Sequence, residues 1–213
     1  GGKGGMGNSN FKTSTNQAPR KSTTGEKGSA LKIRLELRSF ADIGLVGLPN
    51  AGKSTFLDAV SSAKPKIGDY PFTTIKPNLG TIKYFDKSFV FADIPGLIEG
   101  ASQGTGLGIK FLKHISRTKA LLIFLDPHNT EYDFENQLKI LINEMRHFDS
   151  KLLQKDIWIV LNKIDTVDNL DENLTAIDKY IPSELKIHQI RGISSISKQG
   201  VKELFDELFK KLT

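Results

Sequence analysis

The chain has 213 residues, 38% hydrophobic and 25% charged, which suits one main core plus a small appendage. It contains no cysteine, which excludes a disulfide framework and a thiolate metal site. No apolar run approaches the roughly eighteen residues of a membrane span, and no secretory leader opens the chain. We therefore expect a cytoplasmic monomer with no membrane partner.

The first 40 residues differ from the rest in charge and glycine content. They carry eight basic and two acidic side chains, a net charge of +6, whereas the remaining residues hold 22 of each. Such an arm suits contact with a polyanion such as RNA, and a merely solvated basic arm is the alternative. Residues 1–30 include seven glycines and few large apolar side chains, so they cannot build their own core. We expect poor order or left-handed glycines there, with a linker over 20–30.

A phosphate-binding loop is the first motif along the chain. A strand expected over 41–47 and a helix expected over 53–62 enclose the pattern G-x-x-x-x-G-K-S. The glycines let consecutive N–H groups face phosphates, Lys53 supplies a charge to the β and γ oxygens, and the Ser54 hydroxyl is placed to bind Mg²⁺. A nucleoside triphosphate is the expected ligand. The predicted loop residues are Gly47, Leu48, Pro49, Asn50, Ala51, Gly52, Lys53, Ser54 and Thr55.

The second motif is Asp93-Ile94-Pro95-Gly96, which follows strands expected over 81–86 and 88–93. An acid at a strand end can hold Mg²⁺ through water, and the Gly96 N–H can meet a γ-phosphate that is present only before hydrolysis. Taken alone, the tetrapeptide is common and is more typical of a turn. Leu97 stands where Ras-like enzymes keep a water-orienting glutamine, and it forms no hydrogen bond through its side chain, so we predict slow intrinsic hydrolysis.

Two further motifs indicate recognition of a base. The sequence Asn162-Lys163-Ile164-Asp165 follows a strand expected over 156–162. The Asp165 carboxylate can accept hydrogen bonds from guanine N1 and N2, which adenine does not offer, while the Lys163 stem covers the ring. Ser194-Ser195-Ile196 follows a strand expected over 187–193, in the place where a backbone N–H usually meets guanine O6. Because all four motifs lie at carboxyl ends of predicted strands, they predict one guanine-nucleotide site.

The alternation of strands and helices predicts an α/β fold with a mostly parallel sheet and helices on both faces. A strand over 31–38, a strand over 119–126 and helices over 105–117, 131–149, 170–180 and 200–212 complete the expected set. The last helix has a core-facing stripe of Val201, Leu204, Phe205, Leu208, Phe209 and Leu212. We assign to the sheet core Phe85, Phe89, Phe91, Phe124 and Trp158. No chemistry is assigned to His114, His128, His147 or His188.

The flanking sequence resembles the Obg family, within the translation-factor-like class of P-loop GTPases, over essentially the whole chain. The resemblance rests on Gly1-Gly2-Lys3-Gly4-Gly5-Met6-Gly7-Asn8 with Phe11 and Pro19, on Ala41-Asp42-Ile43-Gly44-Leu45-Val46-Gly47, on Tyr70-Pro71-Phe72-Thr73-Thr74 with Pro77-Asn78-Leu79-Gly80, and on Ala92-Asp93-Ile94-Pro95-Gly96-Leu97-Ile98-Glu99-Gly100-Ala101. It implies a P-loop NTPase G domain over 31–213, preceded over 1–30 by the end of a longer glycine-rich domain whose beginning is missing.

The resemblance also implies roles that the residues alone leave open. Thr74 rather than Thr73 becomes the threonine whose hydroxyl completes the Mg²⁺ shell with GTP, and Phe72 lies beside it in the same nucleotide-binding segment. Relatives with asparagine at the position of Asn50 use K⁺ to supply charge at the phosphates. A purely structural role of Asn50 in the loop turn is the alternative. The family acts on the large ribosomal subunit, which favours an RNA-binding role for the basic arm.

Two functions share these nucleotide contacts. One is a Mg²⁺-dependent switch that hydrolyses GTP slowly to GDP and phosphate and serves in large-subunit assembly. The other is a module that senses guanine nucleotides, including guanosine tetraphosphate, with incidental hydrolysis. Comparing ribosomal-subunit affinity of Lys53→Ala and Leu97→Gln would discriminate between them. An ATP-specific protein is a third reading, and the intact motif over 162–165 disfavours it.

Overall fold

The computed structural model describes residues 1–33, 41–63, 65–67, 78–93 and 118–212. The chain divides into two compact units, Gly1–Leu37 and Arg38–Thr213. Within the described ranges, no helix is both long enough and apolar enough to cross a membrane.

The first unit consists of extended segments around one short 3-10 helix, η1 (Asn8–Phe11). Two of its segments run antiparallel, because the Thr23 N–H donates to the Met6 carbonyl and the Glu26 N–H to the Lys3 carbonyl. They approach so closely that a Cβ on Gly5 would lie 1.9 Å from the Thr23 carbonyl oxygen. None of the glycines in this unit has a positive φ, so the prediction of left-handed glycines is wrong. Close backbone approach explains why glycine is needed there.

A seven-stranded sheet forms the centre of the second unit, with strand order β2-β3-β4-β1-β5-β6-β7. The pairs β4-β1, β1-β5, β5-β6 and β6-β7 are parallel, and β3 is antiparallel to both of its neighbours. The mostly parallel sheet predicted from the sequence is confirmed. The strands are β1 (Ile43–Gly47), β2 (Lys66–Ile67), β3 (Asn78–Tyr84), β4 (Lys87–Asp93), β5 (Ala120–Leu125), β6 (Asp156–Leu161) and β7 (Ile187–Gly192).

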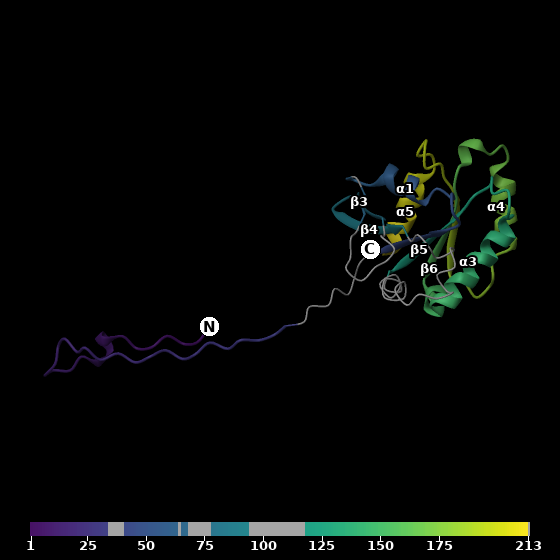
Figure 1. Ribbon diagram of the computed structural model, residues 1–213. Helices are drawn as coiled ribbons and strands as arrows, with labels where there is room; N and C mark the ends of the chain where they lie inside the picture. The colour runs from purple at the N-terminus through teal and green to yellow at the C-terminus, as the bar shows by residue number, and fades with distance from the viewer. Residues whose placement is uncertain (34–40, 64, 68–77, 94–117, 213) are drawn as a thin grey trace. The chain divides into compact units, whose positions relative to one another are not determined.

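Helices cover both faces of this sheet (Figure 1). Consecutive residues of β5 point to opposite faces: Leu121 and Ile123 pack in the cluster with α3 and α4, whereas Leu122 and Phe124 pack in the cluster with α1 and α5. This two-sided burial explains why the strand is apolar without alternation. The helices are α1 (Lys53–Val60), α3 (Phe134–Phe148), α4 (Leu170–Lys179) and α5 (Val201–Leu212), with short 3-10 helices η3 (Ser150–Gln154) and η4 (Ile164–Thr166).

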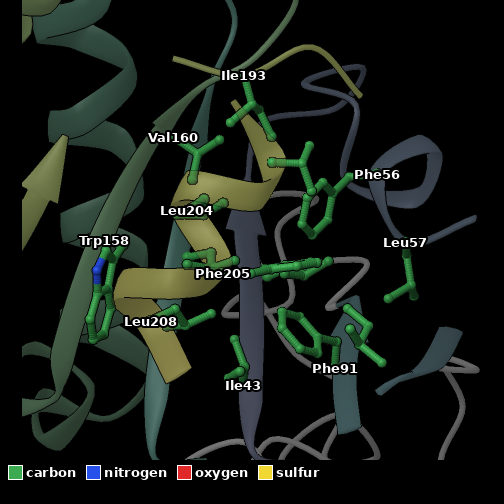
Figure 2. Close-up of a cluster of buried hydrophobic side chains, with 14 of the residues drawn as sticks. Ile43, Phe56, Leu57, Phe91, Trp158, Val160, Ile193, Leu204, Phe205 and Leu208 are labelled. Carbon is green, nitrogen blue, oxygen red and sulfur yellow. The ribbon is translucent and has the colours of Figure 1, made fainter. Parts of the chain in front are cut away.

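The α5 stripe fills the core as predicted. Leu204, Phe205 and Leu208 lie among residues of α1 and the sheet, and Phe205 sits between Phe56 and Phe91 (Figure 2). The Phe56 and Phe205 rings lie 6.1 Å apart at an interplanar angle of 68°. Such a tilted aromatic group ties α5 to the helix that follows the phosphate loop.

Predicted and observed elements agree in type wherever both are described, and their ends differ by at most three residues. Strand β2 was not predicted. The prediction of a strand over 31–38 is wrong for residues 31–33, which lie in no strand. The remaining residues of that predicted strand lie outside the described ranges. The helix expected over 105–117 also lies outside them.

One aromatic assignment is wrong. Phe89, Phe91, Phe124 and Trp158 are buried, but the Phe85 side chain is 88% exposed. Phe85 lies in the two-residue turn between β3 and β4, with φ 49°, so it lies beyond the end of the pleated sheet that would bury it.

Candidate functional site

The phosphate loop joins β1 to α1 through two residues with left-handed backbone. Asn50 has φ 64° and Gly52 has φ 89°, and Gly52 is the residue directly before α1. The Ala51 N–H donates to the Leu48 carbonyl, and the Phe56 N–H donates to the Gly52 carbonyl to begin the helix. The first N–H groups of α1 have no intrahelical acceptor and face the carboxyl edge of the sheet. This arrangement suits an anion such as a chain of phosphates.

Lys53 folds back over this loop. Its ammonium donates to the Gly47 carbonyl at 2.8 Å and to the Leu48 carbonyl at 3.1 Å. Burial lowers the pKa of Lys53, and the Asp93 carboxylate opposes that shift. Among the described residues, this partly buried ammonium donates to neutral carbonyls, so it is well placed to meet phosphate oxygens.

Ser54 at the start of α1 meets Asp93 at the end of β4. Parallel pairing of β1 and β4 sets Leu45 opposite Asp93, and the Ser54 hydroxyl donates to Asp93 Oδ2 at 2.5 Å. Asp93 is buried, and its Oδ1 has no hydrogen-bond partner within the described ranges. A hydroxyl and a buried carboxylate oxygen without a donor are hard oxygen ligands, which fit Mg²⁺ bound directly or through water.

Asn162 clamps the two halves of the site. Its Nδ2 donates to the Ala51 carbonyl at 2.9 Å, and its Oδ1 accepts from both the backbone N–H and the hydroxyl of Ser195. Asn162 is 1% exposed, and these bonds join residues 111 and 33 positions apart in the sequence. The side chain therefore fixes the phosphate loop against the 194–196 loop.

Lys163 and Asp165 follow Asn162, and their side chains differ in hydrogen bonding. Lys163 has φ 63°, and its ammonium donates to Asp126 Oδ2 at 2.6 Å. Asp165 lies in η4, is exposed, and forms no hydrogen bond or ion pair with any residue that the structure describes. Its carboxylate therefore stands ready to accept hydrogen bonds from a ligand.

The three residues over 194–196 differ in whether their backbone N–H groups have a hydrogen-bond acceptor. The Ser194 N–H donates to the Gln199 carbonyl, and the Ser195 N–H donates to Asn162. The Ile196 N–H has no acceptor in the described part of the chain, and its side chain is 78% exposed. Ile196 is thus the member of the trio with a free N–H donor, next to the loop over 162–166 that carries the base motif, called the base loop below.

Parallel pairing brings these groups to one edge of the sheet. The register sets Leu125 opposite Leu161 and Leu161 opposite Gly192, so the residues that follow these strands are neighbours. Six predicted site residues lie outside the described ranges, namely Phe72, Thr73, Thr74, Ile94, Pro95 and Gly96, as does Leu97.

Three residues at this edge were missed in the sequence: Asp126, His128 and Gln137. Asp126 is buried directly after β5, and Gln137 of α3 both accepts from its N–H and donates to its carbonyl. The sequence signal for Asp126 was the same as for Asp93, a polar residue at the end of an apolar strand. No comparable signal marked His128 or Gln137, because the side-chain contacts of His128 with Thr166 and of Gln137 with Asp126 join different elements of the fold.

Comparison with known families agrees with this geometry. The model described as "50S ribosome-binding GTPase" matches residues 42–163, and the model described as "GTP1/OBG" matches residues 1–39. The chain belongs to the family of 50S ribosome-binding GTPases. Two curated Obg relatives, both named "GTPase Obg", come from Chlorobaculum tepidum and Pelodictyon phaeoclathratiforme. They are 48% and 47% identical over 100% of this chain, which covers 61% and 60% of their lengths.

Solved structures share the fold of this chain. The G domain of the T. maritima FeoB iron transporter aligns with a TM-score of 0.57 at 19% identity, covering 80% of this chain and 98% of that one. A GTP-binding protein from Sulfolobus solfataricus, solved in complex with GDP, aligns with a TM-score of 0.62 at 19% identity, covering 80% and 53%. At such identities the likeness concerns the G-domain fold alone.

Proposed function

We propose that this chain binds guanine nucleotides with Mg²⁺ in the cytoplasm, hydrolyses GTP slowly to GDP and phosphate, and acts as a switch in assembly of the large ribosomal subunit. The observation that carries the nucleotide site is the Asn162 clamp, in which a residue of the base motif joins the phosphate loop to the 194–196 loop through three hydrogen bonds. A single ligand that spans both loops, a base linked to phosphates, matches this arrangement.

At the phosphates, Lys53 would supply positive charge to the β and γ oxygens. Ser54 and, through water, Asp93 would hold Mg²⁺, whose charge offsets the charge that builds on the phosphates during transfer. We assign the remaining Mg²⁺ contact to the Thr74 hydroxyl and the γ-phosphate contact to the Gly96 N–H, both on the family resemblance. Thr73, Phe72, Ile94 and Pro95 complete the predicted lining of the switch segments.

At the base, Asp165 would accept from guanine N1 and N2, and the Ile196 N–H would donate to O6. The exposed carboxylate and the free N–H support these roles. Adenine presents neither the paired donors nor the acceptor, so its binding would leave polar groups of the site without partners.

The ribosomal role rests on two findings. The family model over 42–163 is described as a 50S ribosome-binding GTPase, and all of the net charge of +6 resides in the first 40 residues. Phosphate contacts by such a basic segment give affinity that falls steeply with salt.

The test is a titration with fluorescent GDP and GTP in the presence of Mg²⁺, with excess ATP as competitor, followed by sedimentation with purified ribosomal subunits. We expect guanine-selective binding and co-sedimentation with the large subunit in one nucleotide state. Equal competition by ATP would overturn the base assignment. Co-sedimentation that is identical with GDP, GTP and no nucleotide would overturn the switch.

A Ser54→Ala substitution tests the Mg²⁺ assignment. The hydroxyl is the group on α1 that meets Asp93, so its loss removes one Mg²⁺ ligand and leaves the loop backbone in place. We expect the increase in GTP affinity on adding Mg²⁺ to shrink by about tenfold, a typical loss for a disturbed metal site. Isothermal titration with and without EDTA measures it, and an unchanged Mg²⁺ effect would contradict the assignment.

We further propose that K⁺ accelerates hydrolysis through Asn50. The Asn50 side chain is exposed at the phosphate loop and forms no hydrogen bond within the described ranges. We expect GTP turnover at least about tenfold faster in KCl than in NaCl, because a cation there would add charge where it develops in the transition state. Asn50→Gly, which removes the side chain and tolerates φ 64° at this position, should abolish the difference with little change in GDP affinity. Equal turnover in both salts would rule the idea out.

A further inference from the structure

Asp126 is a buried carboxylate at the nucleotide edge to which no role has been given. It is 5% exposed, and it lies directly after β5, between the strands that carry the phosphate loop and the base loop. Its Oδ2 accepts from the Lys163 ammonium at 2.6 Å, and its Oδ1 accepts from the His128 N–H at 3.0 Å. Both carboxylate oxygens therefore have partners, and one partner is a charged residue of the base motif.

The backbone of Asp126 is also fixed. The Gln137 amide, which is 1% exposed, accepts from the Asp126 N–H at 3.0 Å and donates to the Asp126 carbonyl at 2.9 Å. The same amide donates to the Tyr132 carbonyl, so α3 holds the whole start of the loop. A carboxylate on such a rigid support is a fixed anchor for the ammonium.

A closed ring of hydrogen bonds connects this anchor to the base loop. The Thr166 hydroxyl donates to the Lys163 carbonyl, and His128 Nε2 lies 2.6 Å from the same hydroxyl. Because that hydroxyl has one proton and gives it to the carbonyl, His128 Nε2 must carry the proton of the second bond. The ring runs from Asp126 to Lys163, Thr166, His128 and back to Asp126.

This geometry fixes the course of the Lys163 side chain. The backbone of Lys163 is left-handed at the end of β6, whereas its ammonium is held at the end of β5. The four-carbon stem therefore spans the gap between the ends of two neighbouring strands, along the edge where the nucleotide is proposed to lie. Without an anchor, a lysine stem samples many rotamers and must be ordered when a ligand binds.

We propose that Asp126 is a positioning residue for guanine-nucleotide binding, because it pre-orders the Lys163 stem as an apolar wall for the base. The inference rests on the proposed function, since it assumes that the base binds beside Lys163. It separates two roles: Asp165 of the base motif selects the base, whereas Asp126 acts through Lys163 of that motif to set the affinity.

The first test is Asp126→Asn, which keeps an acceptor for the His128 N–H and removes the charge that holds Lys163. We expect the Kd for GDP to rise about tenfold, the cost of ordering a free lysine side chain on binding. The KM for GTP should rise by the same factor with kcat unchanged, because the wall serves substrate and transition state alike. Asp178→Asn, an equal charge change on an exposed face of α4, is the matched control and should leave both values unchanged.

A double-mutant cycle with Lys163→Met distinguishes positioning from a general structural role. Methionine keeps much of the stem but lacks the ammonium, so Asp126→Asn should have no further effect on GDP affinity in that background. Additive losses would overturn the proposal, as would an unchanged Kd in Asp126→Asn alone. If Asp126→Asn fails to fold, Lys163→Met alone carries the test: a tenfold weaker Kd supports the proposal, and an unchanged Kd overturns it.

Different results would contradict the proposed function and the role of Asp126. If wild-type chain shows no preference for GDP over ADP, the proposed function is wrong. If wild-type chain prefers GDP and the cycle is additive, only the role of Asp126 is wrong. Thermal unfolding of each nucleotide-free variant confirms that affinities are compared among folded proteins.

Discussion

Replacing Gly52 with alanine is expected to weaken GDP binding by about a hundredfold or more. The alanine would have to adopt φ 89°, and its Cβ would lie 2.1 Å from Asn162 Nδ2. The hydrogen bond from Asn162 to the Ala51 carbonyl must therefore break. A non-glycine residue in the left-handed region costs about 1–2 kcal/mol, and a buried carbonyl without its donor costs about 1–3 kcal/mol more. Titration with fluorescent GDP measures the loss.

Gly7→Ala is the matched control for this substitution. Gly7 has φ −70° and nothing lies within 4 Å of its added Cβ, so the same chemical change should leave GDP affinity unaltered. Asn162→Ala supplies the converse comparison, because it removes the clashing atom. If Gly52→Ala bound GDP as tightly as the wild type does, the close approach of Asn162 to the phosphate loop would not be needed for GDP binding.

Much of the site was predictable because polar residues follow apolar strands. Asp93 and Asn162 each end a run whose side chains are buried on both faces, and parallel pairing places such ends together. The pattern did not reveal which of these residues also hold the loops of the site together. Asn162 was predicted as a ligand contact, and in the structure its amide also joins Ala51 to Ser195. A bond between residues 111 positions apart leaves no trace in local sequence.

The errors in the fold have physical causes of the same kind. Phe85 looked like a strand residue because it continues an apolar and aromatic run, but β3 ends at Tyr84, two residues before the predicted end of the strand at residue 86. Glycines in the first unit were expected to serve left-handed turns, whereas Gly5 is needed because the Thr23 carbonyl lies against it. The sequence shows that a residue is glycine, but the need for glycine follows from the backbone segment that packs against it.

Asp165→Asn is expected to exchange the preferred base of the site. The wild-type carboxylate is exposed and free to accept from guanine N1 and N2, and hydrogen bonds to a charged group are worth about 1.5–3 kcal/mol each. Losing the charge and one acceptor should weaken GDP binding by roughly a hundredfold to a thousandfold. The asparagine amide offers one acceptor and one donor instead of two acceptors.

Xanthine matches that altered pattern, because it keeps the N1 donor and replaces the N2 amino group with a carbonyl oxygen. The Asp165→Asn variant should therefore bind xanthosine diphosphate more tightly than GDP, whereas the wild-type chain should show the reverse order. Competition of the two diphosphates against a fluorescent nucleotide measures the exchange, with Asp178→Asn as the control for charge. Binding of both diphosphates equally by the variant would show that Asp165 does not contact the base edge. An exchanged preference would place the base beside η4, and thus beside the Lys163 stem that Asp126 holds.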